Sequence, residues 1–523
     1  MVSSRKIVRS RKILVIAGLA AGILFAVAAV LLMEFWPFEP GTVRQEIAQA
    51  SDSSVTLARF HKFYFPTPGC VAEGVTLKHG NATFIRADKI IIRGSYAGLL
   101  SHHLTSLRVT GLQIFVPAIG SGTEFRKNGS DITIEHVIAD GTVVELRSRD
   151  PEKPALRFEV QKAELHNVGY GQSSHYDVVF QNPLPPGEIQ ATGIMGAWNS
   201  QAAGETAVFG RYEFRNADLG VFPGMSGTLW SNGMFDGTLQ HINVSGQTSI
   251  PNFHVRDSSH QVELTTTFAA YVDATSGDVY LHRVDATFGR THLVAHGAIA
   301  KAANGDGKIA RVDLTMDNGR IEDVLGLFVS SKRAPMSGPM TLRTSVEIPS
   351  GHEPFLKKVQ LRGTFGVSEG SFNRIGTQSD VDKLSAGARG ANKDDAPAVA
   401  SELTGSAVVE HGTANFSDLK FQIPGAKARL HGTYSLLNHR VDLHGPMRVD
   451  TKIANTTTGF KSFFLKLINP IFKKRRRGEV IPVHILGTYE HPNFGIDVAG
   501  GEKKARVAPP SRRLTAGETP ALR

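Results

Sequence analysis

The amino-acid sequence predicts a mainly β protein that is preceded by a single membrane-spanning helix. Three observations predict this fold class: an apolar run over residues 13–33, a two-residue apolar alternation in many later segments, and 53 glycines among 523 residues. The chain is too long for one ordinary compact core. We therefore expect either several domains or one extended sheet.

The first element is the membrane helix. Residues 13–33 contain no charged side chain, and 21 residues in a helix span ~31 Å, about one bilayer core. Five cations lie within residues 1–12, which predicts a short cytoplasmic tail, and Trp36 suits the far interface. A cleaved signal peptide is the alternative, but the run is long for one, and no A-x-A site precedes Trp36.

A short helix and then strands follow. Val43, Ile47 and Ala50 share one helical face within residues 41–50. Beyond them the period changes to two, most clearly over residues 262–272, where apolar and polar side chains alternate. Glycine-containing breaks, such as 273–278 and 303–308, are typical of hairpin turns. These patterns predict a mostly antiparallel sheet.

The sheet must cover or use its apolar face. Either a second sheet packs on it, or it curls into a trough that stays open to apolar ligands. We predict a first β region over 34–375, a short helix and polar linker over 376–400, a second β region over 401–499, and a disordered tail over 500–523. A short motif of glycine followed by an aromatic residue recurs, for example at 210–214 and 432–436. Its spacing is irregular, so no fixed-period repeat is predicted.

Charge and motifs exclude several function classes. The net charge is +10, but residues 1–12 and 473–477 hold five cations each, so the remainder is near neutral and nucleic-acid binding is not expected. The single cysteine, Cys70, excludes an intramolecular disulfide and metal sites built from several thiolates. His292 and His296 are too far apart along a strand to share a metal. We find no nucleotide-binding or hydrolase motif, and we predict no catalytic residue, no cofactor and no metal site.

An amphipathic helix is predicted over 459–472, directly before five cations. Lys461 and Lys466 and the short length exclude a transmembrane helix. The segment could be an apolar lid over one end of the sheet or an element that enters a lipid surface. The predicted interface residues are Phe460, Phe463, Phe464, Leu467, Ile471, Phe472, Lys473, Lys474, Arg475, Arg476 and Arg477.

Six stretches carry a resemblance to a known family. They are VTLARFHKFYFPTPGCVAEGVTL (55–77), GSYAGLLSHHLTSLRVTGLQIFVP (94–117), GRYEFRNADL (210–219), SGTLWSNGMFDGTLQHINVSGQTSIPNF (226–253), ELTGSAVVEHGTANFSDLKFQIPGAKARLHGTYSLLNHRVDLHG (402–445) and IPVHILGTYEHPNFGIDV (481–498). In this order they resemble the AsmA-like family of bacterial envelope proteins, which is related in architecture to TamB and YhdP. Each stretch is a soft pattern of glycine, aromatic and apolar positions, so order and extent over residues 13–498 carry the resemblance.

The resemblance implies a bacterial inner-membrane anchor with the bulk in the periplasm, and a curled antiparallel β-groove that takes part in phospholipid transfer and outer-membrane homeostasis. Its implied partners are membrane lipids and other envelope proteins. Exposing acyl chains to water costs about 0.8 kcal/mol per CH₂, so transfer needs an apolar lining. By strand period, candidate lining residues are Leu264, Phe268, Leu430 and Tyr434.

Two other functions stay open at this stage. An envelope assembly factor would bind proteins through sheet edges and carry no lipid. An enzyme such as a glycan hydrolase would pair carboxylates that are distant in the sequence.

Overall fold

The computed structural model describes most of the residues between Phe38 and Asp497. The described ranges are 38–51, 53–79, 82–99, 101–116, 132–146, 155–169, 171–197, 199, 202–222, 224–255, 260–273, 276–302, 307–328, 333–351, 353–389, 397–450, 480–488 and 491–497. The predicted cytoplasmic tail, membrane helix, amphipathic helix 459–472, basic run 473–477 and tail 500–523 lie outside them. Within the described ranges, no helix combines the length and the hydrophobicity needed to cross a bilayer.

The chain divides into two units. The first comprises Met1–Asn373 with Ala407–Gly412, and the second comprises Arg374–Ser406 with Thr413–Arg523. Strands hold 69% of the described residues and helices 12%, which confirms a mainly β protein. Strand β22 (Ser401–Glu410) has residues in both units.

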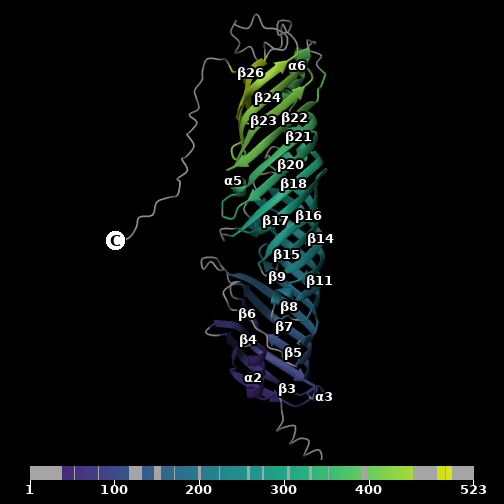
Figure 1. The fold of residues 1–523 in the computed structure, drawn as a ribbon, viewed down its shortest axis with the longest axis vertical. Helices are drawn as coiled ribbons and strands as arrows, with labels where there is room; N and C mark the ends of the chain where they lie inside the picture. Colours follow the sequence, from purple (N-terminus) through teal and green to yellow (C-terminus); the bar gives the residue numbers. More distant parts are fainter. Residues whose placement is uncertain are drawn as a thin grey trace, which may run out of the picture. The chain divides into compact units, whose positions relative to one another are not determined.

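The first unit is a long succession of strands with a few short helices (Figure 1). Its elements are α2 (Pro40–Ser51), β1 (Ser54–Thr56), β2 (Arg59–Phe63), β3 (Gly69–His79), β4 (Ala82–Gly94), α3 (Tyr96–Leu99), β5 (His103–Thr110), β6 (Gln113–Val116), β7 (Thr133–Leu146), β8 (Leu156–Gly169), β9 (Ser174–Pro183), β10 (Pro186–Met195), η1 (Ala203–Glu205), β11 (Ala207–Asp218), η2 (Leu219–Val221), β12 (Met225–Ser226), β13 (Thr228–Thr238), β14 (His241–Val255), β15 (Val262–Asp273), β16 (Asp278–Phe288), β17 (Thr291–Lys301), β18 (Lys308–Arg320), α4 (Ile321–Gly326), β19 (Met336–Ser337), β20 (Pro339–Ile348), α5 (Phe355–Lys358) and β21 (Gln360–Phe372).

Neighbouring strands pair in sequence order, and almost every pair is antiparallel. The exception is β7, which runs parallel to β5 and to β6. Both β5 and β6 already pair antiparallel with β4, so β7 adds on their free side after the connection 117–132. A connection of this length is what a parallel crossover needs. The expected mostly antiparallel sheet is thus confirmed, with one parallel junction that the sequence did not predict.

One kind of connection occurs twice in the first unit: a strand is followed by a short helix and a two-residue strand that pairs with the second long strand after it. We call each of these connections a crossing. Strand β11 leads through η2 to β12, which pairs with β14, and β18 leads through α4 to β19, which pairs with β21. Both crossings contain the sequence Met-Ser-Gly, at 225–227 and 336–338. In both, the glycine carbonyl accepts a backbone hydrogen bond, Gly227 from Leu219 at 2.9 Å and Gly338 from Ile321 at 3.0 Å. The two crossings are therefore repeats of one structural unit.

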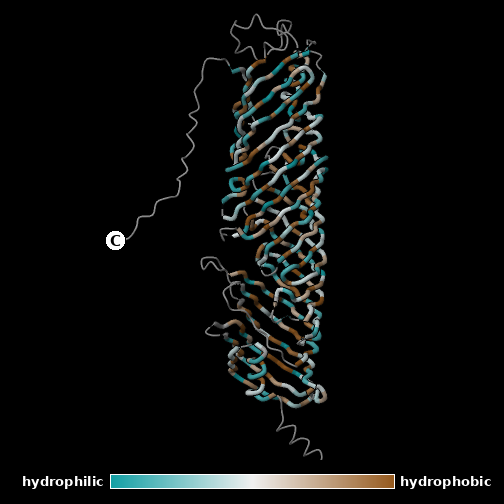
Figure 2. The backbone as a smooth tube through the Cα atoms, in the orientation of Figure 1, coloured by the Kyte–Doolittle hydropathy of each residue, from teal (hydrophilic) through white to brown (hydrophobic). Residues whose placement is uncertain are grey.

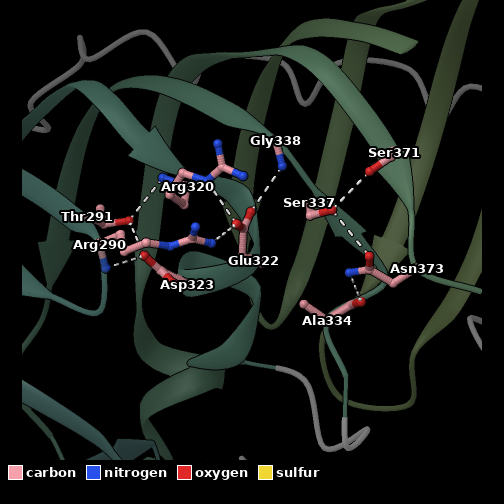
Figure 3. Close-up of polar contacts among 10 residues, drawn as sticks. All are labelled: Arg290, Thr291, Arg320, Glu322, Asp323, Ala334, Ser337, Gly338, Ser371 and Asn373. Atoms are coloured by element: carbon pink, nitrogen blue, oxygen red, sulfur yellow. Dashed lines mark hydrogen bonds and ion pairs between the residues drawn. The ribbon is translucent and has the colours of Figure 1, made fainter. Parts of the chain in front are cut away.

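Polar side chains hold the second crossing in place (Figure 3). Glu322 accepts hydrogen bonds from the Arg290 and Arg320 guanidinium groups and from the backbone N–H of Gly338 at 3.0 Å. Burial acts to raise the pKa of Glu322, but backbone N–H groups and Arg320 outweigh it and lower that pKa. Beside it, Asp323 accepts from the backbone N–H of Arg290 at 2.8 Å.

Thr291→Val should destabilise this crossing by about 2 kcal/mol. The Thr291 side chain is fully buried; its hydroxyl donates to Asp323 at 2.8 Å and accepts from the backbone N–H of Arg320 at 2.9 Å. Valine has the same shape but lacks the hydroxyl, so the Arg320 N–H loses its acceptor and Asp323 keeps the backbone N–H of Arg290 but loses the second donor. Hydrogen exchange of the α4 and β18 amides measures the loss. Thr287→Val, on an exposed neighbouring position, is the control, and an equal effect of both substitutions would contradict the prediction.

The second unit has the same period-two construction. Its elements are α6 (Ile375–Arg389), β23 (Thr413–Ile423), β24 (Ala426–Ser435), β25 (Arg440–Val449), β26 (Val480–Thr488) and β27 (Pro492–Ile496). The strands β23 to β27 pair antiparallel in sequence order. Helix α6 lies where the sequence predicts a short helix and linker at 376–400. One registered row across this unit consists of Phe416, Gly432, Leu443, Ile485 and Phe494, so its sheet also has an apolar face.

Candidate functional site

The first unit carries a continuous apolar face, which we trace through the strand register. Residues that pair directly across consecutive strands from β3 to β21 form a row on one side of the sheet. The row consists of Cys70, Ile92, Leu107, Val137, Leu165, Tyr176, Gly193, Gly210, Phe235, Val244, Ala270, Leu281, Gly297, Val312, Val346 and Leu361. Every member is apolar, glycine or tyrosine.

A second row lies beside the first on the same face. It consists of Ala72, Ile90, Val109, Ala139, Ala163, Val178, Ala191, Tyr212, Gly233, Gly246, Phe268, Val284, Ala295, Leu314, Thr344 and Gly363. Only Thr344 is polar apart from the tyrosine. We call the surface made by these two rows the apolar face; Figure 2 shows the alternation of hydrophobic and hydrophilic residues along the strands that produces it.

Helix α2 packs on the apolar face at β3 to β5, and no second sheet covers the face among the described residues of this unit. All described strands there belong to one succession of neighbours, so no separate sheet packs on the face. Most of its side chains in the middle of the unit, such as Phe235, Val244 and Phe268, are half-buried rather than buried.

A short row of hydroxyl side chains lies beside the second apolar row, on the same side of the sheet. Ser231, Thr248 and Thr266 pair directly across β13, β14 and β15. The hydroxyls of Ser231 and Thr248 are satisfied locally, since the Tyr212 and Thr248 hydroxyls lie 3.1 Å and 3.2 Å from that of Ser231. Paired hydroxyls present little uncompensated polarity to an apolar ligand.

The opposite face of the sheet, here called the polar face, carries ion pairs. Lys162 lies 2.9 Å from Asp177, and Arg311 lies 2.9 Å from Glu347. Exposed ion pairs of this kind add little stability, but they keep the surface hydrated. The polar face also carries exposed apolar side chains, among them Ile194, Phe209, Trp230 and Met234.

A cavity of about 720 Å³ lies under helix α2 in the first unit. Val43 and Ile47 of the helix face strand residues that include Val75, Ile90 and Leu107. A few polar groups also line it, among them Glu46 and His103, whose Nδ1 lies 2.9 Å from the Thr133 hydroxyl. A mainly apolar cavity of this size with a few polar groups is typical of small-molecule sites.

Cys70 belongs to the core beside this cavity. It is fully buried and packs with Phe38, Val43 and Ile92. Burial raises the pKa of the Cys70 thiol to about 12, so the thiol stays protonated at neutral pH and is a poor nucleophile. Cys70 therefore acts as an apolar packing residue.

The structure places the predicted lining residues as follows. Leu264 and Phe268 are half-buried on the apolar face of the first unit, where Phe268 pairs with Gly246 and Val284. In the second unit Leu430 is buried, and Tyr434 is half-buried with its hydroxyl 3.1 Å from Nδ1 of His439. The predicted interface residues in 460–477 lie outside the described residues.

Sequence reasoning missed the cavity under α2. It predicted the helix at 41–50 and the strands, but not that the helix covers them. The apolar side of this helix was the available signal, because Val43 and Ile47 need a partner surface.

The fold and the face together define a mainly β protein whose mostly antiparallel sheet has an apolar face. Comparison of the chain with protein-family models, curated proteins and solved structures gives no match.

Proposed function

We propose that this protein binds phospholipid acyl chains along its apolar face and moves lipid between membranes, as the resemblance to the AsmA-like envelope proteins implies. The protein would be held at the bacterial inner membrane by the predicted helix 13–33, with the bulk in the periplasm. Transfer of this kind needs no catalytic residue and no cofactor.

The continuity of the two apolar rows is the observation that carries the proposal. A lipid that crosses water needs an apolar surface along its whole path, because each exposed CH₂ costs about 0.8 kcal/mol. The rows run from β3 to β21 with Thr344 as their one polar residue apart from tyrosines. A protein that needed this surface only for packing would cover it, and the half-buried state of Phe268 leaves it available.

The cavity under α2 supports the same proposal at one end of the succession. Its lining shares four residues with the apolar rows, namely Ile90, Ile92, Leu107 and Val109. An acyl chain that reaches β4 and β5 would therefore meet a mainly apolar cavity. We propose this cavity as a terminal lipid-binding position.

Photo-crosslinking tests the proposal. A benzophenone amino acid is placed in the full chain either at Phe268, on the apolar face, or at Thr265, exposed on the polar face of the same strand. We expect phospholipid adducts by mass spectrometry at position 268 and none at position 265. Equal labelling at both positions would overturn the proposal. Protein adducts at 268 without lipid would favour an envelope assembly factor instead.

A further inference from the structure

Three metal-ligating side chains meet on the side of the second unit's sheet opposite its apolar row. His444 on β25 pairs directly with His484 on β26, and Asp497 directly follows β27. Nδ1 of His444 lies 3.0 Å from one carboxylate oxygen of Asp497, and Nδ1 of His484 lies 2.6 Å from the other. One ligand atom from each of the three residues lies within 4.8 Å of the others.

A fourth residue orients one of the histidines. Nε2 of His444 lies 2.9 Å from Oδ1 of Asp442, so the two ring nitrogens of His444 both face carboxylates. A neutral imidazole can donate from only one nitrogen. The arrangement is therefore complete only if a cation, either a proton or a metal ion, lies on the second nitrogen. A histidine that donates one N–H to a carboxylate and offers its other nitrogen is the usual geometry of a metal ligand.

The second histidine is held by a glycine. A Cβ atom at Gly495 would lie 2.2 Å from Nε2 of His484, so only glycine at this position lets the ring lie against β27. That placement keeps Nδ1 of His484 directed at Asp497. The site is thus fixed by backbone on one side and by Asp442 on the other.

We propose that His444, His484 and Asp497 bind a divalent transition-metal ion, with Zn²⁺ as the representative, and that Asp442 positions His444. Two imidazole nitrogens and one carboxylate oxygen form a ligand set that Zn²⁺ accepts, with water at the fourth position. The three side chains are half-buried, so a metal ion can reach them from solvent. Among the described strands, β27 pairs only with β26. A bound metal ion would link the end of β27 to β25 as well.

A second cluster of similar composition, in the first unit, suits a metal less well. His136 and His166 are stacked with ring centroids 4.5 Å apart and an interplanar angle of 11°. Stacked rings direct their nitrogen lone pairs side by side rather than toward one point. The third member, Glu164, already has the ammonium group of Lys162 at 3.4 Å.

Zn²⁺ binding by the untagged full chain tests the proposal, in competition with a chromophoric chelator and in the absence of lipid. We expect one site that His484→Gln weakens at least tenfold, and Asp442→Asn should weaken it by about 10–100-fold through loss of orientation. His491→Gln, which removes a histidine from the same β26–β27 hairpin outside the cluster, is the matched control and should bind as the unchanged protein does.

Co²⁺ replaces Zn²⁺ as a spectroscopic probe, and its visible absorption should show nitrogen and oxygen ligands in the wild type and in His491→Gln, but not in His484→Gln. Wild-type affinity in His484→Gln would overturn the metal site, and wild-type affinity in Asp442→Asn would overturn the role of Asp442. If His484→Gln does not fold, Asp497→Asn, which removes the carboxylate ligand and keeps the shape of the side chain, takes its place, and wild-type affinity in Asp497→Asn would overturn the metal site. Because lipid is absent, the result is independent of the proposed lipid function.

Discussion

Phe268→Glu should remove most of the bound phospholipid from the purified full chain, reducing it by more than about tenfold. Phe268 lies in the middle of an apolar row, between Gly246 and Val284. A carboxylate there has no cation paired with it across the strands, and an acyl chain beside it would have to desolvate the charge, which costs several kcal/mol. Quantitative mass spectrometry of extracted lipid measures the effect.

Thr265→Glu is the matched control. It adds the same charge on the same strand, but at an exposed position opposite Ser249 and Thr287 on the polar face. We expect lipid content within about twofold of the unchanged protein. A similar loss in both variants would mean that charge on β15 disturbs the fold, and no loss in either would contradict an apolar lipid path.

Gly432→Ala should destabilise the second unit's sheet by about 3 kcal/mol. Gly432 has φ +142°, and a Cβ there would lie 2.0 Å from the backbone oxygen of Asp442. That oxygen belongs to the paired strand and cannot move without breaking the register of β24 and β25. Amide hydrogen exchange of β24 and β25 should accelerate by roughly 100-fold.

Gly376→Ala in helix α6 is the control for this substitution. Nothing lies within 4 Å of a Cβ at this position, and alanine favours a helix over glycine by up to about 1 kcal/mol. We expect exchange of the strand amides to stay unchanged there. If Gly432→Ala also left exchange unchanged, the close approach of β24 and β25 at this residue would be wrong.

Local features of the fold could be predicted from the sequence, and non-local ones could not. The alternation at 262–272 is a property of neighbouring residues, so it predicts both the strand β15 and the face on which Leu264 and Phe268 lie. The parallel pairing of β7 with β5 depends on which strand edge is free, and no periodicity within either strand encodes that. The repeated crossing was also missed, although the Met-Ser-Gly sequence at 225–227 and 336–338 was a usable signal.

The candidate metal cluster is another non-local feature that could not be predicted from the sequence. His444 and His484 belong to segments separated by a long connection, and their meeting depends on the register of β25 against β26. A shift by one residue would place one of them on the other face of the sheet. Their sequence neighbours, Leu443 and Ile485, reveal the strand period but not this pairing. The cluster therefore became visible only with the register.

The repeated crossing has a consequence for how such a protein can change in size. In the first unit most strands contact only the strands beside them, so the sheet is assembled in series rather than around one centre. The two crossings, at 225–227 and 336–338, lie at the two ends of one segment. That segment therefore begins and ends in the same local geometry. Removing or duplicating that segment would change the reach of the protein while each remaining strand kept an equivalent neighbour. The number of strands in the first unit's sheet can therefore change without a change in how each strand is paired.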